Sequence, residues 1–405
     1  MHAQMPLKRR PGGPITGRSV STLVADPPTS APPSDLMAAA LAAEREGVRA
    51  RFLQLALDAR QTVLPDNLDP LFFPWGHALP DPAQAGRRLA EQLAILDRCT
   101  TLWRRLGDEP SRELFLRFLA YKALGPAHVR LQFDPARYRR AVIELSAKAI
   151  AQPGPLGALG LPLEWQFHLY DLSVGGYPIR LLGQQLPLAS TFVLSQYAYR
   201  ELAAGAHPRP GDVALDVGGC WGDTALWLAH HVGPQGAVHT FEPTPRNRAL
   251  LQRNLDLNPE LSERITVWGD PLGPVAGEPL WVRDAVAAGA QPQAEAAAVP
   301  AADGVETVEL RTETIDALVA RGALPRVDFL KVDVEGADVG VLEGAVQTLA
   351  EHRPRLALAC YHKPDDLVRL PELVDSLGLA YRWYLQCSTM THVDTVLFGV
   401  PAGRR

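Results

Sequence analysis

The chain has 405 residues, a formal net charge of −5, 47% hydrophobic residues and 21% charged residues. This length suits two or three domains, and this composition suits a folded globular core. The slightly acidic balance lacks the basic character of nucleic-acid-binding proteins, so no nucleic acid is expected as a partner. No apolar run approaches the roughly 20 residues that cross a bilayer, so we expect no membrane span. Pro and Gly follow the basic residues at the amino terminus where a secretory signal needs an apolar segment, so we expect a cytoplasmic location.

The four cysteines are far apart in the sequence and form no C-x-x-C pair. A disulfide framework is not indicated in so long a chain. Combining Cys360 and His362 with Cys387 and His392 would supply four zinc ligands, but structural zinc sites usually show tighter paired spacing. We therefore expect reduced thiols in the core and no metal.

The first 160 residues predict a tail followed by helices. Residues 1–35 are rich in Pro, Ser and Gly and lack the apolar content that would order them. Apolar residues then recur at helical spacing over residues 36–59, 86–106, 111–124 and 138–150. Glu113 and Gly125 mark the start and the end of the third segment. We therefore expect a helical domain over residues 36–160.

Residues 161–205 predict a β-hairpin and a connecting helix. Residues 164–172 and 177–182 are rich in strand-forming residues and flank a turn at 173–176. The helix is predicted over residues 191–204.

From residue 206 onward, strands and helices alternate, which predicts parallel strands covered by helices. The predicted strands are 213–217, 237–241, 265–268, 327–332, 355–361, 380–385 and 393–400, and the helices are 223–231, 245–257, 337–349 and 364–377. The last two strands are joined by too few residues for a crossover helix, so the last strand should be antiparallel. We expect a doubly wound α/β domain over residues 206–403 with a mostly parallel seven-stranded sheet. Residues 285–304, which are mostly Ala, Gln and Pro, should form a flexible insertion.

The sharpest motif is D-V-G-G-C-W-G-D-T at residues 216–224, between the first strand and the first helix of this domain. Ligands of open α/β sheets bind beyond the carboxyl ends of the strands. Gly218, Gly219 and Gly222 lack the Cβ atoms that would obstruct a close approach of backbone and ligand. We predict that these glycines and Cys220 contact a cofactor, and the alternative is a tight turn with no ligand.

Three acidic residues complete the predicted cofactor site. Asp216 lies at the end of the strand, where a carboxylate can receive a cationic group. Glu242 follows the next strand, about 20 residues beyond the glycines, which is the separation at which an acid accepts hydrogen bonds from ribose hydroxyls. Asp270 follows the strand predicted at 265–268 and is the third acidic contact.

The glycine spacing distinguishes between cofactors that contain adenosine. A pyrophosphate needs the pattern G-x-G-x-x-G at the start of a helix, but the corresponding positions after Gly218 are Cys220 and Asp223. An aspartate there repels a pyrophosphate, yet it tolerates S-adenosylmethionine, which carries an ammonium and a sulfonium. We therefore favour S-adenosylmethionine and keep a nicotinamide-dependent oxidoreductase as the alternative.

These motifs together resemble the FkbM family of methyltransferases. The resemblance continues through F-E-P, N-L-x-L-N, V-D-F-L-K-V-D-V-E-G-A-D, V-L-E-G-A, Y-H-K-P and D-T-V-L-F, in this order between residues 241 and 398. It implies a class I, Rossmann-like fold, S-adenosylmethionine as the methyl donor and most often a hydroxyl acceptor. Cys387 and Asp394 stand where the family commonly has His and Glu, so no acceptor-side role is carried over to these two positions.

A second polar cluster follows the strand predicted at 327–332. Lys331, Asp333 and Glu335 alternate with apolar residues and therefore share one face. Charges at the end of a central, buried strand indicate a functional site, and the alternative is a Lys331–Asp333 ion pair with a helix-capping acid. Because charge disappears when a methyl group leaves a sulfonium, a useful carboxylate must face the acceptor oxygen.

His362 lies just after the next strand and is a further candidate base, because the ordinary histidine pKa of about 6.5 suits proton transfer. We predict that Asp333, Glu335 and His362 are catalytic, with Glu335 ranked last because it can simply cap a helix. The predicted function is O-methylation of a hydroxyl on a sugar, glycan or secondary metabolite. A module that binds S-adenosylmethionine without turnover is the alternative from another class.

Overall fold

The computed structural model describes residues 33–68, 81–131, 134–151, 167–201, 203, 205–284 and 307–403. The predicted tail up to residue 32 and the predicted insertion at 285–304 lie outside these residues. The chain divides into two units, with the boundary between Glu46 and Gly47. The domain boundaries given in the sequence analysis stay predictions. Among the described helices, none is long and apolar enough to cross a membrane.

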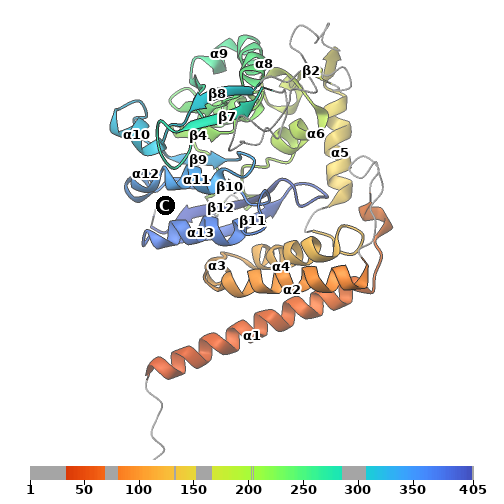
Figure 1. Cartoon of the computed structure of the whole chain (residues 1–405). Helices are drawn as coiled ribbons and strands as arrows, with labels where there is room; N and C mark the ends of the chain where they lie inside the picture. Colours follow the sequence, from red (N-terminus) through yellow and green to blue (C-terminus); the bar gives the residue numbers. More distant parts are fainter. Residues whose placement is uncertain are drawn as a thin grey trace, which may run out of the picture. The chain divides into compact units, whose positions relative to one another are not determined.

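A seven-stranded sheet with the order β11-β12-β10-β9-β4-β5-β6 forms the centre of the second unit (Figure 1). Its strands are β4 (Val213–Val217), β5 (Ala237–Phe241), β6 (Ile265–Trp268), β9 (Phe329–Val332), β10 (Arg355–Ala359), β11 (Tyr381–Cys387) and β12 (Thr395–Pro401). β12 is antiparallel to β10 and β11, and the other neighbours are parallel. This confirms the predicted doubly wound sheet with an antiparallel last strand. The strand order reverses between β4 and β9, where ligands of such sheets bind.

Helices cover both faces of this sheet. They are α7 (Asp223–Val232), α8 (Pro245–Asp256), α9 (Pro259–Ser262), α10 (Ile315–Ala320), α11 (Asp338–Glu343), α12 (Val346–His352) and α13 (Asp366–Ser376). Leu215 and Leu330 pack with side chains of α11, α12 and α13, whereas Ala214 and Phe329, one residue earlier, pack with α7. Because side chains alternate along a strand, these two clusters lie on opposite faces.

The single helix predicted over residues 337–349 is wrong, because the chain forms α11 and α12 with a break at Gly344. A Cβ atom on Gly344 would lie 2.1 Å from the carbonyl oxygen of Gly273, so a neighbouring loop approaches the backbone closely here. The Asp316 carboxylate accepts hydrogen bonds from the backbone N–H groups of Gln347 (2.9 Å) and Thr348 (2.8 Å). These bonds start a new helix.

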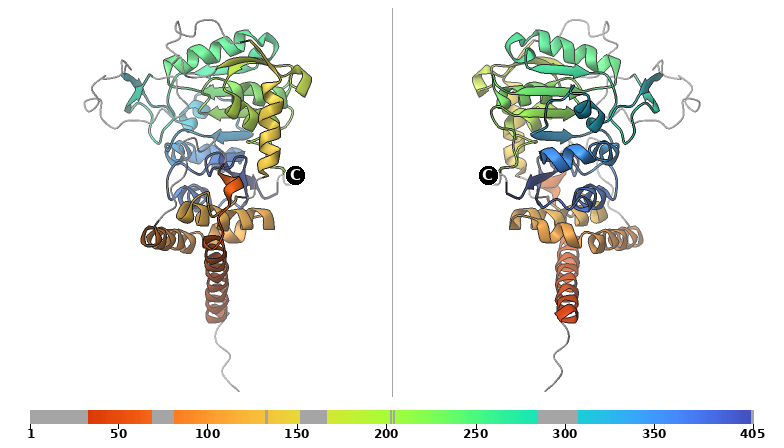
Figure 2. Two further views of the ribbon diagram at one scale, coloured as in Figure 1. Left: turned by 90° about the vertical axis from the view of Figure 1, so that its right-hand side faces the viewer. Right: turned by 90° about the vertical axis from the view of Figure 1, so that its left-hand side faces the viewer.

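Two smaller sheets accompany the main one. β1 (Ala149–Ala151), β2 (His168–Asp171) and β3 (Arg180–Gly183) form an antiparallel sheet. This confirms the predicted hairpin and adds β1, which was predicted as the end of a helix. β7 (Pro279–Arg283) and β8 (Thr307–Arg311) form an antiparallel ribbon that stands apart from the main sheet (Figure 2).

Two asparagines of the N-L-x-L-N motif, Asn254 in α8 and Asn258 just before α9, attach the β2–β3 hairpin to these helices. The Asn254 amide accepts a hydrogen bond from Leu182 N (2.7 Å) and donates one to Leu182 O (2.9 Å). Asn258 makes the same pair of bonds with Arg180 N (2.9 Å) and O (2.6 Å). Each amide thus satisfies the edge of β3 as a neighbouring strand would.

The amino-terminal region is helical as predicted, with two corrections. Its helices are α1 (Pro33–Arg60), the short 3₁₀ turn Pro65–Asn67, α2 (Pro82–Arg98), α3 (Thr100–Arg105), α4 (Glu109–Leu124) and α5 (Pro135–Ser146). The helix predicted over 86–106 breaks at Cys99. α4 begins at Glu109, two residues before the predicted start at Ser111, and the carboxylate of its N-cap Asp108 accepts from Ser111 N. Within the second unit, the N–H of Gly107, between α3 and α4, donates to Trp383 O of β11 at 2.7 Å.

The helix predicted over residues 191–204 is also wrong. The chain forms α6 (Gln185–Leu188) and a π-helical turn at Ala189–Val193, and it then turns at Ser195, which has a φ of 54°. The Thr191 hydroxyl donates to Asp223 at 3.1 Å. Tertiary contacts therefore override the helical pattern and direct this segment across the carboxyl ends of the central strands.

Candidate active site

A cavity of about 950 Å³ opens at the carboxyl ends of the central strands. This volume lies within the range of about 300–1,000 Å³ found for small-molecule sites. The predicted site residues that line it are Gly218, Cys220, Glu242, Asp270, Asp333, Glu335 and His362. Three further predicted residues are buried beneath its wall: Asp216, Gly219 and Gly222.

Asp216 is fully buried, and the cation that it receives belongs to the protein. Lys331 Nζ lies 3.0 Å from Asp216 Oδ1. Threonine hydroxyls from α7 and β5 donate to the same carboxylate at 2.9–3.0 Å. Burial alone would lower the pKa of Lys331, but the charges of Asp216 and Asp333 raise it. The ion pair weighed from the sequence was Lys331 with Asp333, and the structure instead forms it between Lys331 and Asp216.

The glycine turn bends back over the end of β5. Gly218 has a φ of 91°, and a Cβ atom there would lie 1.9 Å from the carbonyl oxygen of Asp333. Its N–H donates to Phe241 O at 3.0 Å. Cys220 also has a positive φ, of 44°, and its N–H donates to Glu242 Oε2 at 2.9 Å. Only glycine fits at position 218. The hydrogen bond from Cys220 N–H connects this turn to Glu242, the acid after β5.

Glu242 is buried at the wall of the cavity and is oriented by three donors. Besides Cys220 N–H, it accepts from Thr244 N (2.9 Å) and from the Asn247 amide (3.3 Å). Burial raises the pKa of Glu242. Asp270 also lines the cavity, in an exposed position after β6, which is the neighbour of β5 in the sheet. Both acids are therefore placed on the side of the glycine turn.

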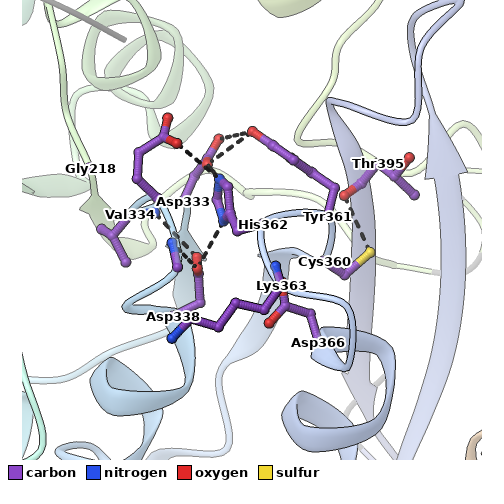
Figure 3. A network of polar contacts seen from close by, with 12 residues as sticks. Gly218, Asp333, Val334, Asp338, Cys360, Tyr361, His362, Lys363, Asp366 and Thr395 are labelled. Atoms are coloured by element: carbon purple, nitrogen blue, oxygen red, sulfur yellow. Dashed lines mark hydrogen bonds and ion pairs between the residues drawn. The ribbon is translucent and has the colours of Figure 1, made fainter. Parts of the chain in front are cut away.

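The other side of the cavity holds a network around His362, which Figure 3 shows from close by. His362 Nδ1 lies 2.9 Å from Asp338 Oδ2, and Nε2 lies 3.2 Å from Asp333 Oδ1. Asp338 also accepts from the N–H groups of Val334 (3.2 Å) and Gly336 (3.0 Å), so it closes the turn after β9. One imidazole thereby links two carboxylates from that turn.

This geometry sets the charges of the network. Burial alone would lower the pKa of His362, but the two carboxylates raise it to about 10. Burial alone would raise the pKa of Asp333, but His362 and Lys331 lower it to about 2. At neutral pH the pair is therefore an imidazolium and a carboxylate. Neither group then suits the role of a catalytic base. This argues against placing Asp333 and His362 ahead of Glu335 for that role.

Glu335 extends from the same turn with a φ of 54°, in the left-handed region that residues with side chains seldom adopt. Its Oε2 lies 3.8 Å from His362 Nε2, and a third of its side chain is exposed. Burial raises the pKa of Glu335.

Sequence reasoning missed four polar residues here: Tyr197, Tyr361 and Asp394, which line the cavity, and Asp338, which is buried behind His362. Tyr197 donates to Asp333 at 2.6 Å, and Tyr361 donates to it at 3.2 Å. Asp338 orients the imidazole, and Asp394 lines the cavity from the turn before β12. The motifs quoted above contain three of the four, but nothing in the sequence places Tyr197 here, because its segment was predicted as a helix.

The described residues include no group of three or more His, Cys, Asp and Glu side chains that could hold a metal ion. The thiols of Cys360 and Cys387 instead contact backbone carbonyl oxygens, at 3.3 Å from Thr395 O and 3.2 Å from Thr391 O.

The chain is similar to one protein family and to several solved structures. Residues 204–381 match the family described as the methyltransferase FkbM domain. Among solved structures, the chain is similar to methyltransferase FkbM from Methylobacillus flagellatus KT, with 19% identity and a TM-score of 0.45 over 77% of this chain and 60% of that chain. It is also similar to Aeropyrum pernix fibrillarin with bound S-adenosyl-L-methionine (14% identity, TM-score 0.30, 59% of this chain and 96% of that chain). A third similar structure is a SAM-dependent O-methyltransferase from Thermotoga maritima (14% identity, TM-score 0.30, 54% and 72%). No curated protein matches the chain.

The order of the seven strands and the antiparallel β12 define a class I methyltransferase fold. Residues 204–381 match the methyltransferase FkbM domain, which confirms the resemblance seen in the motifs.

Proposed function

We propose that the protein transfers a methyl group from S-adenosylmethionine to a hydroxyl of a sugar, glycan or secondary metabolite. The observation that carries this proposal is a single cavity with two different walls. One wall holds the glycine turn and Glu242, and the other holds the ion pair of Asp333 and His362. A donor and an acceptor can therefore meet at the point where the strand order reverses.

The residues of the first wall fit S-adenosylmethionine. Glu242 is held by two backbone N–H groups and an amide, so its carboxylate is ready to accept hydrogen bonds from both ribose hydroxyls. Gly218, Cys220 and Asp270 line the space around it. Asp223 at the start of α7 disfavours the pyrophosphate of a nicotinamide cofactor. When bound, S-adenosylmethionine supplies a methyl group on a positively charged sulfur.

The charges of the second wall favour an acceptor without a negative charge. Among the described residues that line the cavity there is no arginine, and the ammonium of Lys331 is engaged by Asp216 and by Gly218 O (2.6 Å). Asp333 and Glu335 add negative charge around the imidazolium of His362. A phosphate or carboxylate group on the acceptor would be repelled, whereas neutral hydroxyls find many partners.

Within this proposal, Asp333 and His362 act as a fixed ion pair that orients the acceptor. Two tyrosine hydroxyls donate to Asp333, which limits its movement. Most of the rate acceleration should come from aligning the acceptor oxygen with the methyl carbon and sulfur in a closed site. The acceptor proton then passes to another carboxylate of the cavity.

The test is transfer of isotope-labelled methyl from S-adenosylmethionine to neutral hydroxyl compounds, followed by mass spectrometry of the products. Methyl glycosides are suitable first probes, and the corresponding sugar phosphates are the matched controls. We expect products heavier by one CH₂ from the neutral compounds only. Preferred methylation of the sugar phosphates would refute the acceptor class. Tight binding of S-adenosylmethionine without transfer to any hydroxyl would favour a non-catalytic binding module.

A further inference from the structure

Asp394 lines the cavity from a strand that holds none of the candidates discussed above. It directly precedes β12, which is antiparallel to β10. The N–H of Cys360 donates to Thr395 O at 3.2 Å, so the register places Asp394 beside Tyr361 at the carboxyl end of β10. The amino end of β12 and the carboxyl ends of the parallel strands therefore meet at the same edge of the sheet.

The backbone of Asp394 is held in an unusual conformation. Its φ is 69°, in the left-handed region that residues with side chains seldom adopt. Hydroxyl groups fix the turn around it, because Thr395 Oγ1 donates to His392 O (2.6 Å) and Thr389 Oγ1 donates to Val393 O (2.8 Å). Aspartate adopts this region more readily than most residues, and the neighbours of Asp394 hold it there at the wall of the cavity.

The surroundings of Asp394 differ from those of Asp333. The titratable groups that face it are Asp333, Glu335, Tyr361, His362, Tyr197 and Cys387. Burial, assisted by the charge of Asp333, raises the pKa of Asp394 to about 7, although a hydrogen bond from the side chain of Gln196 opposes this. In the described part of the chain, no ion pair joins Asp394 to a cation, whereas Asp333 contacts His362.

We propose that Asp394 is the catalytic base that accepts the proton of the acceptor hydroxyl. This inference rests on the proposed function and adds to it a residue that the sequence motifs left without a role. Among the acids of this half of the cavity, Asp333 is engaged by His362, and Glu335 lies 3.8 Å from the same imidazolium. Asp394 approaches from the strand beside β10, and among the described residues it has no such cationic partner, although the Gln196 side chain hydrogen-bonds it.

The step is balanced without a further reactant. The acceptor oxygen forms a bond with the methyl carbon while the bond between carbon and sulfur breaks, and that electron pair stays on sulfur. The hydroxyl proton moves to the Asp394 carboxylate, which becomes a neutral acid. Asp394 then releases the proton to water before the next turnover.

The first test needs no acceptor. Carbon-13 NMR of the aspartate carboxyl groups in the full-length protein with S-adenosylhomocysteine, compared between wild type and Asp394→Asn, assigns the titration of this residue. We expect a carboxyl that titrates near pH 7, as its pKa of about 7 indicates. A carboxyl that titrates near the ordinary aspartate value of about 3.9 would overturn the proposal.

The second test compares variants in the methyl-transfer assay with the hydroxyl compound that wild type methylates. Asp394→Asn should lower turnover by about 10²–10⁴-fold, leave the affinity for S-adenosylhomocysteine unchanged and remove the loss of activity below about pH 7. Asp394→Glu should restore part of the turnover, and Glu343→Gln, at the exposed end of α11, should match wild type.

Near-native turnover of Asp394→Asn, or its loss in Glu335→Gln alone, would overturn the assignment of the base. Failure of wild type to methylate any hydroxyl would instead refute the proposed function, and the NMR titration would still decide the state of Asp394.

Discussion

The two walls of the cavity are built in different ways. The wall with the glycine turn comes from one short stretch of chain, residues 216–224, and from the acid after the next strand. The opposite wall combines the turn after β9, the end of β10, the turn before β12 and the segment that carries Tyr197. A local motif thus forms the first wall, whereas distant segments form the second.

This difference has a physical reason. A cofactor with a fixed structure can be held by backbone geometry, and the contact between Gly218 and the carbonyl of Asp333 leaves no room for variation. An acceptor is recognised by side chains that converge from several loops, and such loops can change without disturbing the sheet. The buried pair of Lys331 and Asp216 connects the two walls beneath the cavity.

The largest effect should come from breaking that connection. Asp216→Asn leaves the buried ammonium of Lys331 without its partner, and we expect the free energy of unfolding to fall by about 3–5 kcal/mol. Chemical denaturation measures this change. Glu343→Gln on the surface should stay within about 0.5 kcal/mol of wild type. If the free energy of unfolding of Asp216→Asn fell by less than about 1 kcal/mol, the ion pair would not be what stabilises the base of the cavity.

The second effect concerns how stability depends on pH through His362 in the second wall. The pKa of His362 is raised from 6.5 to about 10, so its contribution to stability is fully present below pH 6.5 and is lost as the pH rises through 10. Between these values wild type should lose roughly 2–4 kcal/mol more than His362→Gln. Denaturation curves at several pH values provide the measurement, and parallel pH profiles would contradict a charged imidazole.

A smaller effect separates the roles of the two walls. Glu242→Ala should weaken binding of S-adenosylhomocysteine by about ten- to a hundredfold for each ribose bond lost, because hydrogen bonds to charged groups contribute about 1.5–3 kcal/mol. Asp333→Asn should change this affinity much less. Isothermal titration calorimetry distinguishes the two variants. Equal losses of affinity would show that both walls bind S-adenosylhomocysteine.

The smallest effect tests how the hairpin is attached. The Asn258 amide bonds to both backbone groups of Arg180, so Asn258→Ala should cost about 1–2 kcal/mol of stability without changing cofactor affinity. Thermal unfolding and calorimetry of the variant check this. A lower affinity with unchanged stability would mean that the hairpin acts on the site and not on the fold.

The sequence predicted the sheet well because its strands depend on local patterns, whereas the cofactor contacts of the first wall stay a prediction. Strands 213–217, 237–241 and 265–268 have their predicted bounds, and the predicted contacts Gly218, Cys220 and Glu242 line one cavity. The helix predicted over 191–204 was wrong because Ser195 and the contacts of Thr191 depend on the folded chain.

For the second wall too, the sequence predicted which residues come together but not their charges. Asp333, Glu335 and His362 were expected to come together, and they do, but their charges depend on neighbours that spacing does not reveal. Asp338 lies five residues after Asp333 in the sequence, yet only the fold brings its carboxylate to His362. Protonation states are therefore the part of the site that requires three-dimensional structure.

The central claim is that the first wall holds S-adenosylmethionine. The most direct measurement is isothermal titration calorimetry of the full chain with S-adenosylhomocysteine and, separately, with NAD. We expect S-adenosylhomocysteine to bind wild type and to bind Glu242→Ala more weakly, while NAD shows no heat of binding. Binding of NAD without any binding of S-adenosylhomocysteine would contradict the claim.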